Sequence, residues 1–165
     1  MADMNEQRPR RVSVIGAGTC DPALYETART LGVLLAGSGF TVVCGGLGGV
    51  MTAVCQGAKE AGGDTIGILP GDDAATANPF VDVPVVTGLG IARNVLVVKN
   101  GEATVAVSGG AGTLSEIGLA LKIGRPVVVL GHFDTLAGVV PAATPQQAVS
   151  LVKSLLAGKD HAGSS

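Results

Sequence analysis

Short runs of apolar residues alternate with longer amphipathic stretches along most of the chain. The apolar runs span 11–15, 40–44, 64–69, 84–87, 103–107 and 126–130, and each has the length of a buried β-strand. The stretches between and after them predict helices over 22–36, 50–61, 88–100, 113–123 and 146–156. This alternation predicts an α/β fold: a Rossmann-like, three-layer sandwich of a mainly parallel sheet with helices on both faces.

Local signals set several of the expected boundaries. Asp21 is a good N-cap, and Pro22 suits the first position of the helix that follows it. The segment 70–82 predicts a loop and 131–145 a turn-rich connection. We therefore expect a flexible N-terminus over 1–10, a single ligand-binding domain over 11–157 and a flexible tail over 158–165.

Composition narrows the class of protein. The 165 residues are 47% hydrophobic and only 15% charged, which fits one compact domain with a substantial core. A net charge of -2 and an aromatic content of 2% give no electrostatic or stacking basis for binding nucleic acid. No apolar run is long enough to span a membrane, and the first ten residues are polar. We expect no membrane partner and a cytoplasmic protein.

Glycine-rich turns follow three of the predicted strands, at 16–19, 44–51 and 108–116. Glycine lets the main chain approach an anion with its amides turned inward, and the N-terminus of the next helix adds partial positive charge. Because parallel strands end at the same edge of a sheet, these turns predict one phosphate-binding crevice. The predicted ligand-binding residues are Gly16, Gly18, Gly45, Gly46, Gly48, Gly49, Met51, Arg93, Asn94, Ser108, Gly109, Gly110, Gly112, Thr113 and Glu116.

Two charged residues and one apolar residue of this set have alternative interpretations. Glu116 stands three residues after Thr113, so the pair could form a capping box at a helix start, or Glu116 could contact the ligand as an acid or base. Arg93 interrupts an apolar run, and is either an anion-binding group or a surface arginine with a buried stem. Met51 is either a core residue or an apolar wall for a ring.

Other common nucleotide and metal motifs do not fit. The turn after the first strand lacks the third glycine of a dinucleotide-binding fingerprint, and no carboxylate ends the second strand. Neither of the longer glycine turns is followed by the lysine of a P-loop, and the histidines and cysteines lack metal-ligand spacing. We expect no metal site and no required cofactor.

The motif at 109–116 (G-G-x-G-T-x-x-E), the motif at 45–51 (G-G-x-x-G-V-M) and Arg93 between them resemble the Lonely Guy (LOG) superfamily, whose members often carry the label "possible lysine decarboxylase". No lysine stands in a recognisable pyridoxal-phosphate setting, so that activity is not expected. In the hydrolase branch, the resemblance implies that Glu116 and Arg93 assist cleavage of the N-glycosidic bond of a nucleoside 5'-monophosphate. Glycine loops in that branch hold the phosphate.

The sequence departs from the hydrolase pattern at several positions, and these departures favour a second branch of the same superfamily. Ser108 stands where the hydrolases have proline, and the sequence around Arg93 lacks their arginine-lysine pair. These features resemble the molybdenum cofactor carrier proteins, which implies binding of a pterin phosphate as cargo without bond cleavage. We favour the carrier over the phosphoribohydrolase, with a nucleotide sensor as a further alternative. Apolar helices and the resemblance together predict a homodimer or homotetramer.

Overall fold

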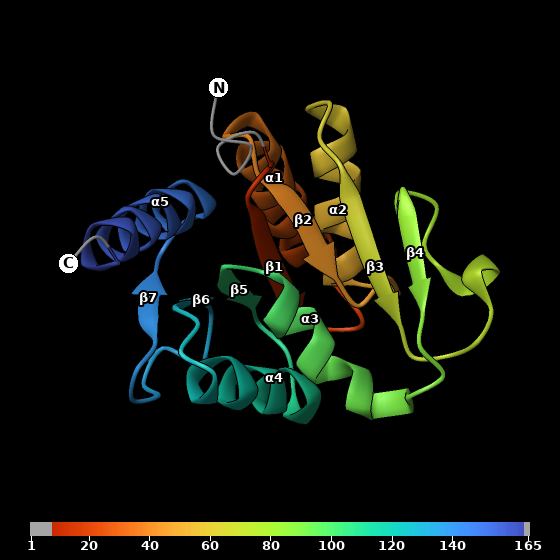
Figure 1. Cartoon of the computed structure of the whole chain (residues 1–165). Coiled ribbons are helices and arrows are strands. Elements are labelled where there is room, and N and C mark those ends of the chain that lie inside the picture. Colours follow the sequence, from red (N-terminus) through yellow and green to blue (C-terminus); the bar gives the residue numbers. More distant parts are fainter. Residues whose placement is uncertain (1–7, 164–165) are drawn as a thin grey trace, which may run out of the picture.

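A seven-stranded parallel sheet forms the centre of the molecule, with strand order β4-β3-β2-β1-β5-β6-β7 (Figure 1). The computed structural model describes residues 8–163. The strands are β1 (Arg11–Gly16), β2 (Thr41–Cys44), β3 (Thr65–Leu69), β4 (Val83–Val86), β5 (Ala103–Val107), β6 (Val127–Leu130) and β7 (Val140–Ala142). The predicted fold class is confirmed, and the sheet proves to be parallel throughout.

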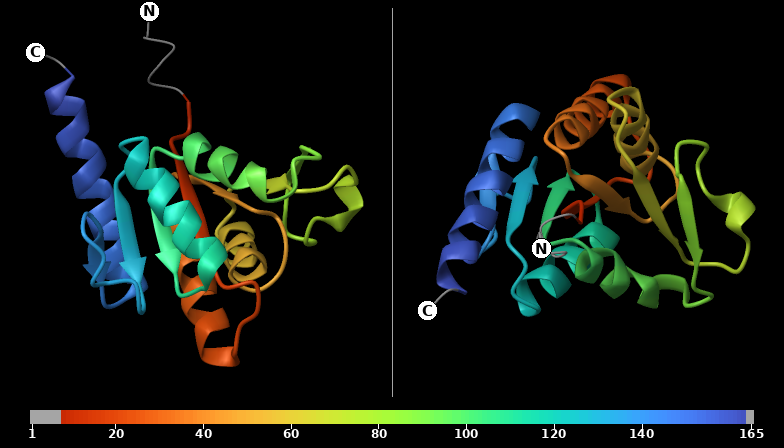
Figure 2. Two further views of the ribbon diagram at one scale, coloured as in Figure 1. Left: turned by 90° about the horizontal axis from the view of Figure 1, so that it is seen from below. Right: turned by 45° about the horizontal axis from the view of Figure 1, so that its top comes forward.

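Helices cover both faces of this sheet, so the molecule has three layers (Figure 2). The helices are α1 (Pro22–Gly37), α2 (Val50–Glu60), α3 (Asn94–Asn100), α4 (Ala111–Lys122) and α5 (Pro145–Ala162), with short 3-10 turns η1 (Ala74–Thr76) and η2 (Gly90–Arg93). One core layer joins α1, α2 and α5 to the sheet, and the other joins α3 and α4 to its opposite face.

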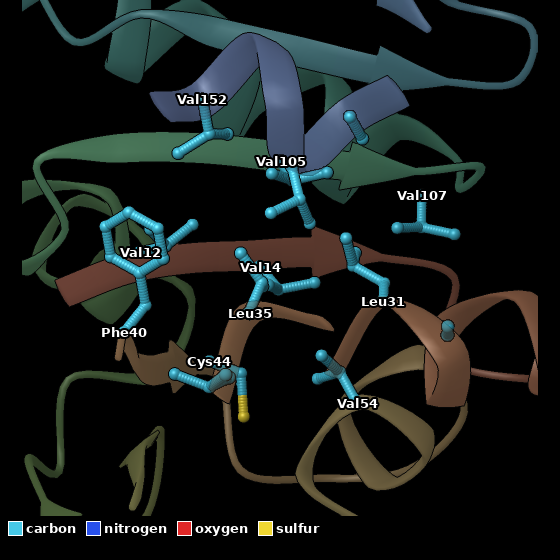
Figure 3. Close-up of a cluster of buried hydrophobic side chains, with 14 of the residues drawn as sticks. Val12, Val14, Leu31, Leu35, Phe40, Cys44, Val54, Val105, Val107 and Val152 are labelled. Atoms are coloured by element: carbon cyan, nitrogen blue, oxygen red, sulfur yellow. The ribbon is translucent and has the colours of Figure 1, made fainter. Parts of the chain in front are cut away.

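Successive side chains of a strand point to opposite faces of the sheet, so a central strand contributes residues to both core layers. Val12 and Val14 of β1 are fully buried against the α1, α2 and α5 layer, as Figure 3 shows together with Leu31 and Val54. Ile15 points to the other face and belongs to the α3 and α4 layer. Strands that are buried on both faces have apolar residues at successive positions, which explains the continuous apolar runs of the sequence.

The two edge strands each contain a proline, Pro84 in β4 and Pro141 in β7. Proline has no amide hydrogen to donate, so it is tolerated at an edge and discourages pairing with another chain. The three-residue strand β7 was not predicted, because its segment has the composition of a turn. It nevertheless pairs with β6 through Val128 and Val140.

The structure confirms the predicted start of the first helix and differs from two other predicted helix boundaries. The cap of α1 is confirmed, since the Asp21 carboxylate accepts the Leu24 amide at 2.8 Å. The single helix predicted over 88–100 is instead η2 followed by the short helix α3. The predicted end of the last helix at 156 is wrong, because α5 continues to Ala162. Within the termini predicted to be flexible, 1–7 and 164–165 lie outside the described residues.

Candidate functional site

A cavity of about 410 Å³ opens beyond the carboxyl ends of the central strands. The chain runs from β1 outward to β4, and then crosses back to place β5 on the other side of β1. The loops after β1 and β5 therefore diverge, and ligands of open parallel sheets bind at such a switch point. The cavity is lined by Val14, Ile15, Gly16, Ala17, Gly18, Gly45, Met51, Pro70, Gly90, Ile91, Arg93, Asn94, Gly110, Gly112, Thr113 and Glu116.

The structure brings most of the predicted ligand-binding residues together around this cavity. Residues from all three predicted turns line it, together with Arg93 and Glu116. Five predicted positions are absent from the lining: Gly46, Gly48, Gly49, Ser108 and Gly109. Sequence reasoning missed Val14, Ile15, Ala17, Pro70, Gly90 and Ile91. Pro70 directly follows β3, so the rule that selected the other turns could have found it.

Open main-chain donors mark the start of α4, which we call the α4 corner (108–113). Gly110 is the N-cap and no side chain caps the helix. In the part of the chain that the structure describes, the amides of Ala111, Gly112 and Thr113 donate no hydrogen bond to the protein. These amides are the unpaired donors of a helix N-terminus, and Gly112 and Thr113 line the cavity. The α4 corner therefore presents free donors to an anion.

The helix start also corrects the capping-box interpretation of Glu116. Because α4 begins at Ala111, Thr113 is the third helical residue rather than the N-cap. Glu116 is therefore the sixth helical residue, in the second turn, where it cannot reach back to an N-cap amide. The capping box predicted for Thr113 and Glu116 is therefore wrong.

The start of α2, which we call the α2 corner (44–51), uses its amides differently. The amide of Val50 donates to the carbonyl oxygen of Ala17 at 2.9 Å, and that of Met51 donates to Gly48 at 3.3 Å. Val50 is also fully buried. At these two positions the amides are engaged within the protein, contrary to the prediction that they face a ligand.

The glycines of the α2 corner allow close contact between loops. Gly49 has φ 62°, and a Cβ atom there would overlap the carbonyl oxygen of Ala17. Gly46 has φ 76°, and a Cβ there would lie 2.8 Å from the Leu69 side chain. The Gly46 amide donates to the Cys44 sulfur at 3.3 Å. These glycines therefore serve packing, which is why their positions do not line the cavity.

Arg93 ends η2 and directs its guanidinium across the cavity to the α2 corner. A Cβ atom on Gly45 would overlap an Arg93 nitrogen, so only glycine leaves room for the guanidinium there. The Nε atom of Arg93 is buried without a hydrogen-bond partner. Burial lowers the pKa of Arg93, with a smaller opposing effect from Glu116. A half-buried guanidinium with a buried, unused Nε donor is better explained by an anionic ligand than by a surface position.

Glu116 faces the same cavity from α4. Burial raises the pKa of its carboxyl group to about 7, although the charge of Arg93 acts in the opposite direction. Among residues 8–163, the two groups form no ion pair within 4.0 Å. The cavity thus holds a cation and a carboxyl group that is poised to gain or lose a proton near neutral pH.

Apolar side chains form the remaining walls, and a second groove adjoins the cavity. Met51 and Pro70 line the cavity, and Ile91, which is 88% exposed, lines both the cavity and the groove. Asn94 and Gly112 also border both. The groove has a volume of about 530 Å³ and runs between η2, α3 and α4. A flat ring at the cavity mouth would therefore meet aliphatic rather than aromatic surface.

The backbone at Ser108 explains one departure from the hydrolase pattern. Ser108 has φ 52°, a left-handed conformation that is uncommon for residues other than glycine. A proline ring holds φ near -65°, so proline cannot occupy this position without a change in the backbone.

Metal ligands are not gathered anywhere in the described part of the chain. No group of three or more histidine, cysteine, aspartate or glutamate residues lies within reach of one ion there. The cavity itself offers amides, one guanidinium and one carboxyl group, which suit a phosphorylated organic molecule better than a bare cation.

Comparison with known proteins agrees with this architecture. A molybdenum cofactor binding protein from Rippkaea orientalis is 38% identical, with a TM-score of 0.86 over 91% of this chain and 99% of that chain. The molybdenum cofactor carrier protein of Chlamydomonas reinhardtii is 41% identical, with a TM-score of 0.84 over the same shares. A cytokinin riboside 5'-monophosphate phosphoribohydrolase of Mycobacterium tuberculosis is 34% identical over 126 residues, covering 68% of this chain and 67% of the relative.

Within residues 8–163, none of the helices has the length and apolar character needed to cross a bilayer.

The model of the SLOG cluster4 family matches residues 9–156. This match and the relatives above confirm the LOG-like resemblance carried by the glycine motifs. The chain belongs to the SLOG cluster4 family.

Proposed function

We propose that the protein binds the pterin phosphate of the molybdenum cofactor as cargo and acts as a carrier. The observation that carries the proposal is the polarity of the cavity. Free amides of the α4 corner and the half-buried guanidinium of Arg93 offer donors to a phosphate, while Met51, Pro70 and Ile91 form apolar walls for a ring. The molybdenum cofactor proteins of R. orientalis and C. reinhardtii support the choice of ligand, because the match spans 99% of each.

The same residues favour a second candidate, a nucleoside 5'-monophosphate phosphoribohydrolase. Arg93 and Glu116 face one cavity, and a carboxyl group with a pKa of about 7 can donate or accept a proton at physiological pH. In such a reaction Glu116 would assist departure of the base or activate water, and the α4 corner would hold the phosphate. The left-handed backbone at Ser108, where the hydrolases have proline, favours the carrier.

One pair of assays separates the candidates. Purified molybdopterin is titrated into the protein under anaerobic conditions, and saturable binding is expected. The protein is then incubated with adenosine monophosphate and its N6-substituted analogues, and released base is measured. The carrier predicts no free base. Turnover that disappears in Glu116→Gln would overturn the carrier and establish the hydrolase.

We also propose that the protein forms a homodimer or homotetramer through the groove beside the cavity. Ile91, which lines this groove, is 88% exposed, and Leu114 of α4 is 43% exposed, whereas the apolar residues of α5 pack against the sheet. Sedimentation velocity of the protein and of Ile91→Asp checks this, and a wild-type monomer would contradict it.

A further inference from the structure

Two cysteines lie in contact beneath the cavity, and neither belongs to the ligand-binding set. The sulfur atoms of Cys44 and Cys55 are 3.5 Å apart, and both side chains are fully buried. Both are free thiols. Figure 3 shows the Cys44 sulfur within the core layer on the α1 and α2 side of the sheet. The third cysteine, Cys20, is only partly buried and lies in the loop before α1.

Each member of the pair is joined through the chain to a residue of the cavity. Cys44 is the last residue of β2 and directly precedes Gly45, against which the Arg93 guanidinium packs. Cys55 lies one helical turn after Met51 on α2, and Met51 lines the cavity. A change in the distance between the two sulfurs is therefore expected to move the main chain near Gly45 and near Met51.

The surroundings of the two sulfurs differ. The Cys44 sulfur accepts the Gly46 amide at 3.3 Å, and the Cys55 thiol is placed to donate to it. The hydrogen bond from Cys55 and the Gly46 amide lower the pKa of Cys44, although burial acts against them. The same hydrogen bond and burial raise the pKa of Cys55. Cys44 is thus the sulfur with more thiolate character, and Cys55 stands ready as the resolving thiol.

We propose that Cys44 and Cys55 form an oxidisable dithiol whose conversion to a disulfide weakens ligand binding in the adjacent cavity. The oxidant is a small peroxide. The Cys44 thiolate attacks one oxygen of hydrogen peroxide, which gives a sulfenic acid and hydroxide. The Cys55 sulfur then displaces the sulfenic hydroxyl as water, so that two thiols and one peroxide yield one disulfide and two waters.

Bond formation must move the main chain at the α2 corner. The sulfurs have to approach from 3.5 Å to about 2.05 Å. The Cys44 sulfur also loses its thiolate character and with it the strength of its bond to the Gly46 amide. Because the Arg93 guanidinium packs against Gly45 without spare room, we expect its position to shift and the affinity for a phosphate ligand to fall. The effect on the ligand rests on the proposed function, but formation of the disulfide does not.

The bond itself is tested by mass spectrometry on the whole protein. After peroxide treatment, free thiols are alkylated under denaturing conditions and the protein is cut with trypsin. Residues 30–59 form one tryptic peptide that contains both Cys44 and Cys55, whereas Cys20 falls in the peptide 12–29. We expect the 30–59 peptide unalkylated and lighter by two hydrogen atoms, and restored by reductant. Alkylation of both thiols, or a sulfinic acid on Cys44, would overturn the proposal.

The effect on the cavity is tested with adenosine monophosphate as the probe. Oxidation is expected to weaken its binding by about 10- to 100-fold in the Cys20→Ser background, and reductant to restore it. The matched control, Cys20→Ser with Cys44→Ser, removes the sulfur that attacks peroxide but keeps an acceptor for the Gly46 amide, so it should bind as the reduced protein does and be unaffected by peroxide. Unchanged affinity after complete disulfide formation would overturn the coupling.

A ligand-free readout separates failure of this inference from failure of the proposed function. The backbone amide resonances of Gly45 and Gly46 should shift on oxidation, and peroxide should not shift them in the Cys44→Ser control. If reduced protein binds neither adenosine monophosphate nor molybdopterin, the proposed function fails. The peptide masses and these amide shifts still decide whether the dithiol is oxidised and whether the cavity wall moves with it.

Discussion

The α2 corner and the α4 corner have similar sequences but different roles in the fold. Each follows a buried strand, contains several glycines and opens a helix. At the α2 corner, Gly49 has a backbone that only glycine tolerates easily, and the Val50 amide is bonded to the neighbouring loop. At the α4 corner, Gly110 and Gly112 have open space where a Cβ would be, and the first helical amides have no protein partner.

Structural glycines and ligand-binding glycines can thus be distinguished by what surrounds the position of their Cβ. A glycine that packs against another backbone is required for folding, while a glycine next to open space and free amides is required for access by a ligand. Substitutions at the two corners should therefore fail in opposite ways.

Gly49→Ala should destabilise the protein most. Its φ of 62° disfavours a side chain, and the added methyl would overlap the Ala17 carbonyl oxygen. We expect the free energy of unfolding to fall by about 3 kcal/mol or more, measured by urea denaturation. Gly62→Ala is the matched control, because Gly62 also has positive φ, at 75°, but open space around it. An equal loss in both variants would show that backbone overlap at the α2 corner is unimportant.

Arg93→Met should abolish most of the ligand affinity. The variant keeps an apolar stem but removes the only cationic side chain among the cavity-lining residues of the described chain. We expect binding of molybdopterin to weaken by on the order of 100-fold in a titration, with the fold retained. Arg11→Met removes an exposed arginine outside the cavity and should bind normally. Equal affinity of Arg93→Met and wild type would remove Arg93 from the site.

Glu116→Gln tests the electrostatics of the cavity. The pKa of Glu116 is raised from 4.5 to about 7, so the folded state binds more protons than the unfolded state between these pH values. The free energy of unfolding therefore decreases as pH rises through this window, by about 3 kcal/mol in total. Glutamine cannot ionise, so the variant should lose this decrease and be more stable than wild type at pH 8. Parallel stability curves for the two proteins from pH 4 to 8 would contradict the assignment.

Gly112→Ala should separate stability from binding at the α4 corner. Alanine stabilises a helix relative to glycine by about 0.5–1 kcal/mol, and no atom lies within 4 Å of the added Cβ. The methyl group would nevertheless enter the cavity and weaken ligand binding by about tenfold. Gly118→Ala lies in the same helix with equal space and outside the cavity, so it should gain stability and bind normally. Unaltered binding in Gly112→Ala would place the ligand elsewhere.

Periodicity was sufficient for most of the fold and part of the site. The apolar runs predicted six of the strands. Five of these lie inside the sheet and leave a continuous apolar signal, whereas the edge strand β4 is apolar in sequence although all of its residues are exposed. The strand β7 was missed because three residues with a central proline leave almost none. The capping-box interpretation was wrong because the Thr-x-x-Glu pattern does not show where the helix begins. The helix α4 begins at Ala111, two residues before the threonine of that pattern.

The sequence predicted the charged side chains of the cavity, but not which main-chain amides are free or which apolar side chains are exposed. Arg93 was singled out as a charge in an apolar run, and Glu116 as an acid beside a glycine turn. Which amides remain free depends on contacts between distant loops, such as Val50 with Ala17, and these have no local signature. Ile91 was missed because an isoleucine in an apolar run resembles a core residue, yet it is 88% exposed.

An amide chemical-shift titration of isotope-labelled protein with adenosine monophosphate tests most directly whether the free amides of the α4 corner receive an anion. We expect saturable shifts that are largest at Gly110, Ala111, Gly112 and Thr113, with little change at Val50 and Met51, whose amides are already bonded within the protein. Shifts that are largest at the α2 corner, or no saturable shift at the α4 corner, would contradict the claim that free amides at the start of α4 receive the anion.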